Sequence, residues 1–147
     1  MLEINNIISK RELTDIIRVS SDEFKPPLNT LIKISDYCEK LLEKASIFVA
    51  RENNIVVGLI AFYCNDQVQK QAYLSYLYVR TDKRRKKIGQ TLLRKAILHS
   101  RECGMKSMKL ETRRDNPSTF LYRINGFVND TSQKTKNNGR IRMTTRF

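Results

Sequence analysis

The sequence predicts a mixed α/β fold built around a single sheet. Its segments follow the order strand, two helices, three strands, helix, strand, helix and two strands. A hydrophobic content of 40% is enough for a core, and 147 residues are enough for one domain. Because no internal repeat or low-complexity linker divides the chain, residues 1–147 are expected to form that single domain.

The N-terminal segments are expected to supply one strand and two helices. Leu2–Ile7 is compatible with a first strand and Lys10–Val19 with a helix. Asp22–Asn29 is expected to be non-helical, because Pro26-Pro27 at its centre resists a helix interior. Ser35 is a typical N-cap for a helix that ends near Lys44. One face of that helix carries Ile34, Tyr37, Cys38, Leu41 and Leu42.

Three strand-like runs follow this helix. Ser46–Arg51 and Ile55–Cys64 are separated by Asn53-Asn54, which favours a hairpin turn because Asn tolerates positive φ. Gln71–Val79 is rich in Tyr, Leu and Val and gives the clearest strand pattern of the chain. Asn65-Asp66 predicts the turn that leads into it.

A basic loop, Arg80–Lys87, leads into a long amphipathic helix from about Ile88 to Cys103. Gly104 is placed to end this helix as its C′ residue. The predicted buried stripe of the helix consists of Leu92, Leu93, Ala96, Ile97 and Ser100. The remaining expected segments are a strand over Lys106–Thr112, a short helix over Pro117–Asn125, strands at Gly126–Asn129 and Ile141–Thr145, and a polar, turn-rich stretch over Thr131–Arg140.

The formal net charge of +13 predicts attraction to anions but does not distinguish among them. Nucleic acid, an anionic membrane surface and a phosphorylated ligand all fit, as does a merely solvated basic surface. No run of about 18 apolar residues is present, so no membrane span is expected. The N-terminal residues lack the apolar segment of a signal peptide.

The cysteines Cys38, Cys64 and Cys103 are odd in number and widely spaced. This pattern fits a reducing cytoplasm better than a disulfide framework. His99 and Cys103 lie four residues apart on a predicted helix and could share a metal ion. The chain has one His and no closely spaced Cys pair to complete four ligands, so no metal is expected. The three cysteines and His99 are expected to have packing or surface roles.

The segment Val79–Leu93, VRTDKRRKKIGQTLL, joins the end of a strand to the start of a helix through a cationic loop. Amides at a helix N-terminus lack intrahelical partners and, with the helix dipole, favour anionic oxygen. Gly89 leaves room for a phosphate to approach the backbone, and Ile88 can turn inward. The segment contains neither a Walker loop nor a Rossmann fingerprint, and a loop that is basic only because it is exposed remains an alternative.

This segment resembles motif A of the GNAT superfamily of N-acetyltransferases. The resemblance implies that amides around Arg84, Arg85, Lys86, Lys87, Ile88, Gly89 and Gln90 cradle the pyrophosphate of coenzyme A. It also implies that Leu77, Tyr78 and Val79 pair with the pantetheine arm at a splay in the sheet. The sequence departs from the family at Thr81, where Pro is usual, and at Arg85 and Lys87, where Gly is. If Lys87 has positive φ, the side chain makes this backbone conformation cost about 1 kcal/mol or more. The alternative is that Lys87 is present because its charge binds a phosphate of the cofactor.

A second group of residues is similar to motif B of the same family: Leu110-Glu111-Thr112, Asn116, Phe120-Leu121-Tyr122 and Gly126-Phe127. The resemblance, which runs from about Val49 to Phe127, implies that Tyr122 donates a proton to the coenzyme A sulfur and that Asn116 binds the pantetheine arm. Glu111 lies where some members carry a general base, and Ser75 stands where many others carry a Glu. The backbone N–H of Tyr78 or Val79 would polarise the thioester oxygen.

The family fold is a central, mostly antiparallel sheet with helices on both faces, splayed at the cofactor site. The implied activity is transfer of an acetyl group from acetyl-CoA, without a metal, to the amine of a small anionic acceptor such as an amino sugar nucleotide. A macromolecular acceptor (a protein N-terminus or lysine, or aminoacyl-tRNA) and a non-catalytic binding module remain alternatives. A nucleic-acid partner is not favoured, no membrane partner is expected, and both monomer and homodimer are compatible with the chain. The proposed acceptor walls are Phe24, Pro26, Pro27 and Tyr37 on one side and Lys134–Arg140 on the other.

Overall fold

The computed structural model describes residues 2–20, 34–84, 87–130 and 139–147. Their elements are β1 (Leu2–Asn5), α1 (Lys10–Ser20), α2 (Ile34–Lys44), β2 (Ser46–Glu52), β3 (Ile55–Tyr63), β4 (Gln71–Val79), the 3₁₀ turn η3 (Thr81–Lys83), α3 (Ile88–Glu102), β5 (Ser107–Arg113), α4 (Ser118–Ile124), β6 (Val128–Asn129) and β7 (Arg140–Arg146). The predicted order of strands and helices is confirmed. The expected loop at Asp22–Asn29 and residues 131–138 of the turn-rich stretch lie outside the described residues.

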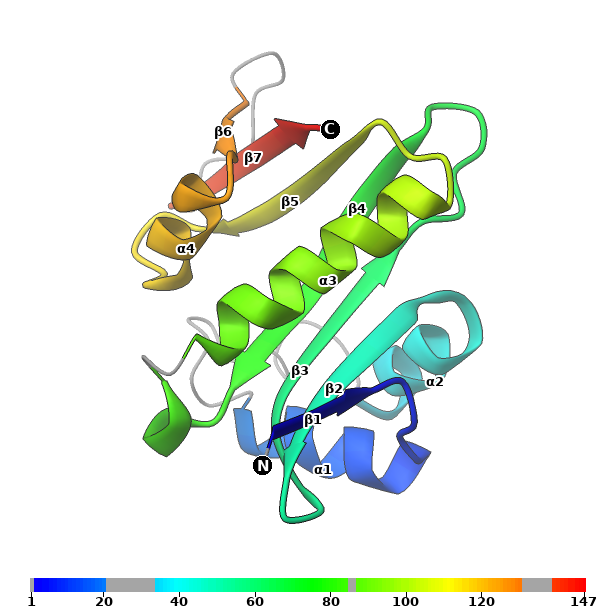
Figure 1. Ribbon diagram of the computed structural model, residues 1–147, viewed down its shortest axis with the longest axis vertical. Helices are drawn as coiled ribbons and strands as arrows, with labels where there is room; N and C mark the ends of the chain where they lie inside the picture. The colour runs from blue at the N-terminus through cyan, green and yellow to red at the C-terminus, as the bar shows by residue number, and fades with distance from the viewer. Residues whose placement is uncertain (1, 21–33, 85–86, 131–138) are drawn as a thin grey trace.

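The strands form one seven-stranded sheet in the order β1-β2-β3-β4-β5-β7-β6 (Figure 1). Neighbouring strands are antiparallel except β4 and β5, which run parallel. A parallel pair needs a crossover connection, and α3 provides it. The predicted mostly antiparallel sheet is therefore confirmed.

Helices cover both faces of the sheet (Figure 1). On one face α3 and α4 bury Leu92, Leu93 and Tyr122 against the sheet in the larger core cluster. On the other face α1 and α2 bury a separate cluster that includes Leu13 and Leu41. Over the part of the chain that is described, no helix is long and apolar enough to cross a membrane.

Most predicted local signals agree with the structure. Asn53 and Asn54 have φ of 51° and 66° in the β2–β3 turn, and Gly104 has φ of 88° after α3. One detail of α2 was wrong: the helix begins at Ile34, so Ser35 lies inside it rather than capping it. On the predicted apolar face, Cys38 and Leu41 are fully buried, whereas Leu42 at its margin is 37% exposed.

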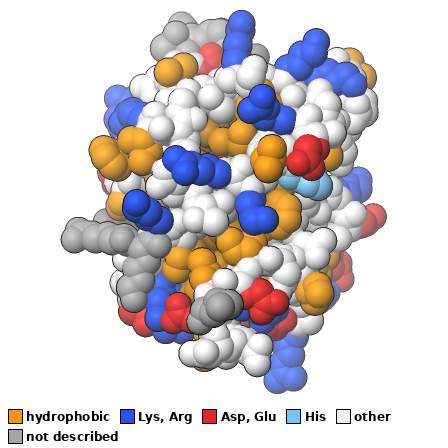
Figure 2. Space-filling model, in the orientation of Figure 1, with side chains coloured by type: hydrophobic (Ala, Val, Ile, Leu, Met, Phe, Trp, Pro, Cys, Tyr) orange, Lys and Arg blue, Asp and Glu red, His pale blue; other side chains and the backbone are white. Residues whose placement is uncertain are grey.

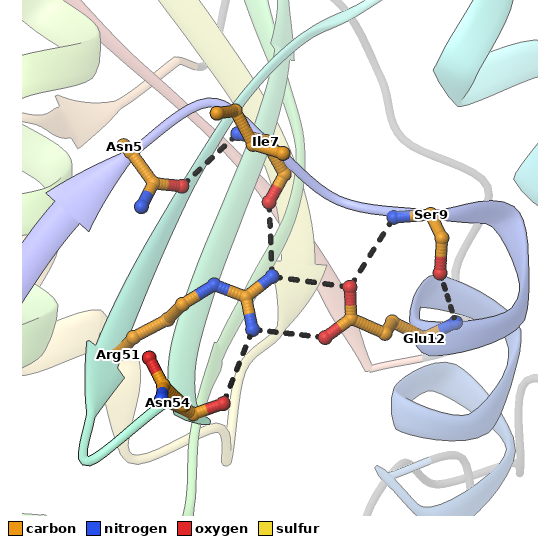
Figure 3. Close-up of polar contacts among 6 residues, drawn as sticks. All are labelled: Asn5, Ile7, Ser9, Glu12, Arg51 and Asn54. Atoms are coloured by element: carbon orange, nitrogen blue, oxygen red, sulfur yellow. Dashed lines mark hydrogen bonds and ion pairs between the residues drawn. The ribbon is translucent and has the colours of Figure 1, made fainter.

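A polar cluster joins α1 to the edge of the sheet (Figure 3). Ser9 and Glu12 cap the start of α1 reciprocally, through Glu12 N–H to Ser9 Oγ at 3.1 Å and Ser9 N–H to Glu12 Oε1 at 3.3 Å. Arg51 of β2 donates to both carboxylate oxygens of Glu12, at 2.9 and 3.1 Å, and to the Ile7 carbonyl at 3.0 Å. The hydrogen bonds from Arg51 lower the pKa of Glu12.

Candidate active site

β4 and β5 lie side by side for four residues and then separate. Their parallel pairing runs from Gln71 with Ser107 to Leu74 with Leu110. At that point β4 contains a bulge: Leu74 pairs with Phe62 and Tyr76 with Ala61, so Ser75 is the extra residue. A bulge bends its strand, and β4 continues to Val79 along β3 while β5 continues along β7. The splay implied by the family resemblance is therefore present, and Ser75 marks where it opens.

The N-terminus of α3 lies beyond the open end of β4. Lys87 is its N-cap and has left-handed backbone angles, φ 64° and ψ 15°. The first helical hydrogen bond runs from Thr91 N–H to the Lys87 carbonyl at 3.0 Å. The amides of Ile88, Gly89 and Gln90 precede it and so lack intrahelical acceptors. This is the backbone geometry that an anionic oxygen requires.

Two glycines let this helix start come close to the sheet. A Cβ on Gly58 of β3 would lie 2.9 Å from Ile88 Cγ2 and 3.1 Å from Leu92 Cδ1. A Cβ on Gly89 would lie 3.2 Å from Leu121 Cδ2 of α4 and 3.4 Å from Val79 Cγ2. Gly89 therefore serves the contact among α3, α4 and β4, and the buried Ile88 anchors the loop as expected.

Ion pairs shape the basic loop. Arg80 donates twice to Asp82, both at 2.6 Å, and Lys83 binds Glu52 at 2.6 Å. Arg84 Nε donates to the Val79 carbonyl at 3.1 Å, which links the loop to the end of β4. Lys87 is exposed. Arg85 and Lys86 lie outside the described residues.

Tyr122 projects from α4 into the larger core, 5% exposed, with its ring 5.8 Å from that of Phe127. Leu77 and Val79 of β4 are partly buried against the same core. Among the described residues, none hydrogen bonds to the Tyr122 hydroxyl. Burial raises the pKa of Tyr122, so the phenol keeps its proton near neutral pH. A protonated hydroxyl in this position can act as an acid.

Asn116 organises the turn between β5 and α4. Its Oδ1 accepts from Ser118 N–H at 2.9 Å, and its Nδ2 donates to Thr112 Oγ1 at 2.8 Å. The Asn116 carbonyl also accepts from Thr119 N–H at 3.0 Å. Asn116 therefore stabilises the turn that leads into α4. Nδ2 has a second hydrogen, so binding of the pantetheine arm is compatible with it and stays a prediction.

Glu111 of β5 is held by two arginines of β7. Arg140 Nε lies 3.1 Å from Oε1, and Arg142 Nε lies 3.5 Å from Oε2. Both carboxylate oxygens are thus engaged in joining β5 to β7 across the Glu111–Arg142 register pair. This arrangement favours a structural role over that of a free base, and the catalytic role stays a prediction.

A hollow of about 540 Å³ lies between α2 and the α2-side face of β3 and β4. We call it the tyrosine hollow; its lining is Tyr37, Lys40, Lys44, Tyr63, Asn65, Tyr73 and Ser75. Tyr37 and Ser75 share a hydroxyl–hydroxyl hydrogen bond of 2.6 Å. Burial raises the pKa of Tyr37 to about 12, so this phenol too stays protonated. The hollow therefore meets the sheet where β4 begins to leave β5.

The structure places several of the predicted site residues near one another. Gly89 lies against Val79 and Leu121, and Tyr122 belongs to the same core cluster as Leu77 and Val79. Tyr37, from one predicted acceptor wall, lines the tyrosine hollow on the α2 side of the sheet. The other expected wall residues, Phe24, Pro26, Pro27 and positions 134–138, lie outside the described residues. The lysines of the tyrosine hollow and the role of Gly58 were missed. A glycine inside a strand pattern is the signal that would have indicated a close backbone approach at Gly58.

On the face that carries α3, hydrophobic side chains are exposed between lysine and arginine side chains (Figure 2). Such a surface suits a ligand that joins an apolar arm to anionic groups. The pantetheine and phosphates of coenzyme A are such a ligand.

Solved structures share this fold over the whole chain. An acetyltransferase of the GNAT family from Staphylococcus aureus Mu50 is 22% identical, with a TM-score of 0.79 and 99% of each chain covered. The PaiA N-acetyltransferase of Thermoplasma acidophilum, solved in complex with coenzyme A, is 21% identical, with a TM-score of 0.78 and coverage of 100% of this chain and 99% of that one. The ribosomal-protein-S18-alanine N-acetyltransferase of Escherichia coli is 20% identical, with a TM-score of 0.76 and coverage of 99% and 94%.

No curated protein matches the sequence. The model of the acetyltransferase (GNAT) family matches residues 12–127, which include β4, the basic loop, α3 and α4. This match spans most of the chain and contains the splayed strands, the helix N-terminus and Tyr122. The chain therefore belongs to the acetyltransferase (GNAT) family and is an N-acetyltransferase.

Proposed function

We propose that the protein transfers the acetyl group of acetyl-CoA directly to the primary amine of a small anionic acceptor, such as an amino sugar nucleotide, in a ternary complex. The observation that carries the proposal is the bulge at Ser75, where β4 leaves β5 between the start of α3 and the tyrosine hollow. The side at the start of α3 suits a phosphorylated co-substrate, and the side at the tyrosine hollow suits a second substrate.

The co-substrate would lie along the open end of β4. Amides of Ile88, Gly89 and Gln90 would receive the pyrophosphate, and the positive charge of Lys87 would add attraction. The pantetheine arm would then follow Leu77–Val79 toward Ser75. Its sulfur would end beside the Tyr122 hydroxyl, which has no hydrogen-bonding partner among the described residues.

The acceptor would occupy the tyrosine hollow. Lys40 and Lys44 give this hollow positive charge, which favours a phosphate or carboxylate on the acceptor. The Tyr37–Ser75 hydroxyl pair at its base can orient an amine toward the splay. A volume of about 540 Å³ suits a small molecule.

The proposed step conserves atoms and protons. The neutral amine forms a bond to the thioester carbon, the carbon–sulfur bond breaks, and the sulfur takes a proton from Tyr122. The new amide nitrogen releases one proton to water in the hollow, and Tyr122 is reprotonated from solvent. With Glu111 held between two arginines, solvent is the simplest proton acceptor.

The test is a thiol-release assay with acetyl-CoA and paired amines with and without a phosphate. We expect Tyr122→Phe to lower kcat by about 100-fold or more. Its Tm should change little, since the lost hydroxyl makes no hydrogen bond to a described residue. Its Kd for coenzyme A should change little as well, because the proposed contacts of the pyrophosphate and the pantetheine arm do not involve this hydroxyl. Phe120→Ala, at an exposed position of the same helix, is the matched control and should keep full activity. Undiminished turnover in Tyr122→Phe would contradict the acid role, and failure of the wild type to bind or turn over acetyl-CoA would contradict the enzyme proposal.

The acceptor assignment has its own test. Lys40→Ala and Lys44→Ala should each raise KM for the phosphorylated amine about 2- to 5-fold while leaving the neutral amine unaffected. Lys95→Ala, on α3 at the opposite face of the sheet, is the matched control. Equal KM changes for both amines would argue against an anionic acceptor.

A macromolecular acceptor is the second candidate, because the net charge of +13 is large for a chain of 147 residues. Transfer to a protein N-terminus or to aminoacyl-tRNA, with strong salt dependence and no turnover of small amines, would favour it.

A further inference from the structure

Three side chains with soft donor atoms meet at the end of α3 remote from Lys87. Cys64 follows the last residue of β3, whereas His99 and Cys103 lie at the C-terminal end of α3. A hydrogen bond from Cys103 N–H to the His99 carbonyl, 3.0 Å long, keeps these two residues one helical turn apart. By helical rise the cluster is about 20 Å from the start of α3. The sequence offered only the His99–Cys103 pair; the tertiary structure adds the second thiol.

The distances are close to those of a tetrahedral metal site. The Cys64 and Cys103 sulfurs are 3.5 Å apart, and the ligand atoms of all three residues lie within 4.8 Å of one another. Zinc–sulfur bonds of about 2.3 Å at a tetrahedral angle place two sulfurs about 3.8 Å apart, and a sulfur and an imidazole nitrogen about 3.6 Å apart. The side chains therefore need to move only about 1 Å to bind one ion.

The surroundings hold the three groups in place. The His99 ring packs edge-on against Phe48 and Phe62, with centroids 5.7 and 5.8 Å away. Ser46 Oγ lies 3.5 Å from the Cys64 sulfur, where it can support a thiolate. Two thiolates would neutralise a divalent cation, so the half-buried site would carry no net charge.

We infer that Cys64, His99 and Cys103 bind a zinc ion, with water in the fourth position. Thiolate and imidazole ligands suit zinc better than magnesium or calcium. The ion would join the end of β3 to the end of α3 and so stabilise the two elements that meet at Gly58. The ion would act by linking these two elements, apart from the acetyl-transfer site.

The experiment uses the full chain without an affinity tag, reduced with a phosphine. Cobalt(II) is the spectroscopic probe, and zinc is then added as the competitor. We expect one equivalent of cobalt to give tetrahedral ligand-field bands with a thiolate charge-transfer band, and zinc to remove both. A hundredfold excess of zinc over its Kd should raise Tm by about 5–10 °C.

Variants locate the ion. Cys64→Ser, His99→Gln and Cys103→Ser should each weaken zinc binding by about 100-fold or more, and Ser46→Ala by about 10-fold. Cys38→Ala removes a thiol buried in the other core and should leave zinc affinity unchanged. The inference is overturned if the wild type gives no thiolate–cobalt band, if Cys64→Ser binds as tightly as the wild type, or if the two thiols form a disulfide in place of a metal site. Coenzyme A affinity, measured in parallel, should not depend on zinc, so failure here leaves the proposed function untouched.

Discussion

Lys87 holds a backbone conformation that disfavours a side chain. Its φ of 64° and ψ of 15° place it in the left-handed region, where a residue with a Cβ costs about 1–2 kcal/mol. Glycine removes that cost but loses about 0.5–1 kcal/mol more conformational entropy on folding. Lys87→Gly should therefore raise the free energy of unfolding by about 0.5–1 kcal/mol.

The assay is urea unfolding with thermal unfolding as a second measure. The expected gain corresponds to an increase in Tm of about 1–3 °C. Lys87→Ala is the matched control: it removes the same charge but keeps the Cβ, so it should gain no stability. Both variants lose the cation near the pyrophosphate, and both should weaken coenzyme A binding about 2- to 5-fold at low salt.

Two results would refute this reasoning. If Lys87→Gly is no more stable than Lys87→Ala, the left-handed conformation does not carry the assumed cost. If coenzyme A binds both variants as tightly as the wild type at low salt, the Lys87 charge does not act on the phosphates. A loss of binding in the glycine variant alone would instead show that the loop needs the stiffness of a side chain.

Three further predictions concern other parts of the fold. Gly58→Ala should cost about 1–3 kcal/mol of stability in urea unfolding and weaken coenzyme A binding, because the new Cβ would lie 2.9 Å from Ile88; unchanged stability would contradict the close approach of α3. Glu12→Gln should lose about 0.5–1 kcal/mol near pH 7, since Arg51 stabilises the charged carboxylate. Because the pKa of Glu12 is lowered in the folded state, this stabilisation is present above the unfolded pKa and is lost as pH falls through the folded pKa. The stabilities of wild type and variant should therefore converge at acidic pH. A difference that stays constant with pH would count against the ion pair. Glu111→Gln should lower Tm, because it removes the carboxylate that binds two arginines. The pH profile of kcat should keep its shape. If the variant instead loses one limb of that profile at unchanged Tm, Glu111 is the base.

Local signals carried most of the fold prediction. The Gln71–Val79 strand has the predicted bounds, and α3 starts at Ile88 as expected. Asn53-Asn54 and Gly104 adopt the positive φ values that their residue types favour. These features depend on residues close together in sequence, so a single sequence is enough to reveal them. The apolar face of α2 did not reveal that Leu42 stays partly exposed, because contact with the sheet decides which part of such a face is covered.

The sequence by itself determined the order of elements, the cationic helix start and the family-like positions of Asn116 and Tyr122. Only the tertiary structure decided where β4 leaves β5, because the bulge at Ser75 is a property of strand register. The tertiary structure also pairs Glu111 with two arginines of β7 that follow Glu111 by about thirty positions in the sequence. It also placed Cys64 beside Cys103, 39 residues away in sequence. Register and long-range contact arise when the whole sheet packs against its helices, and no local pattern encodes them.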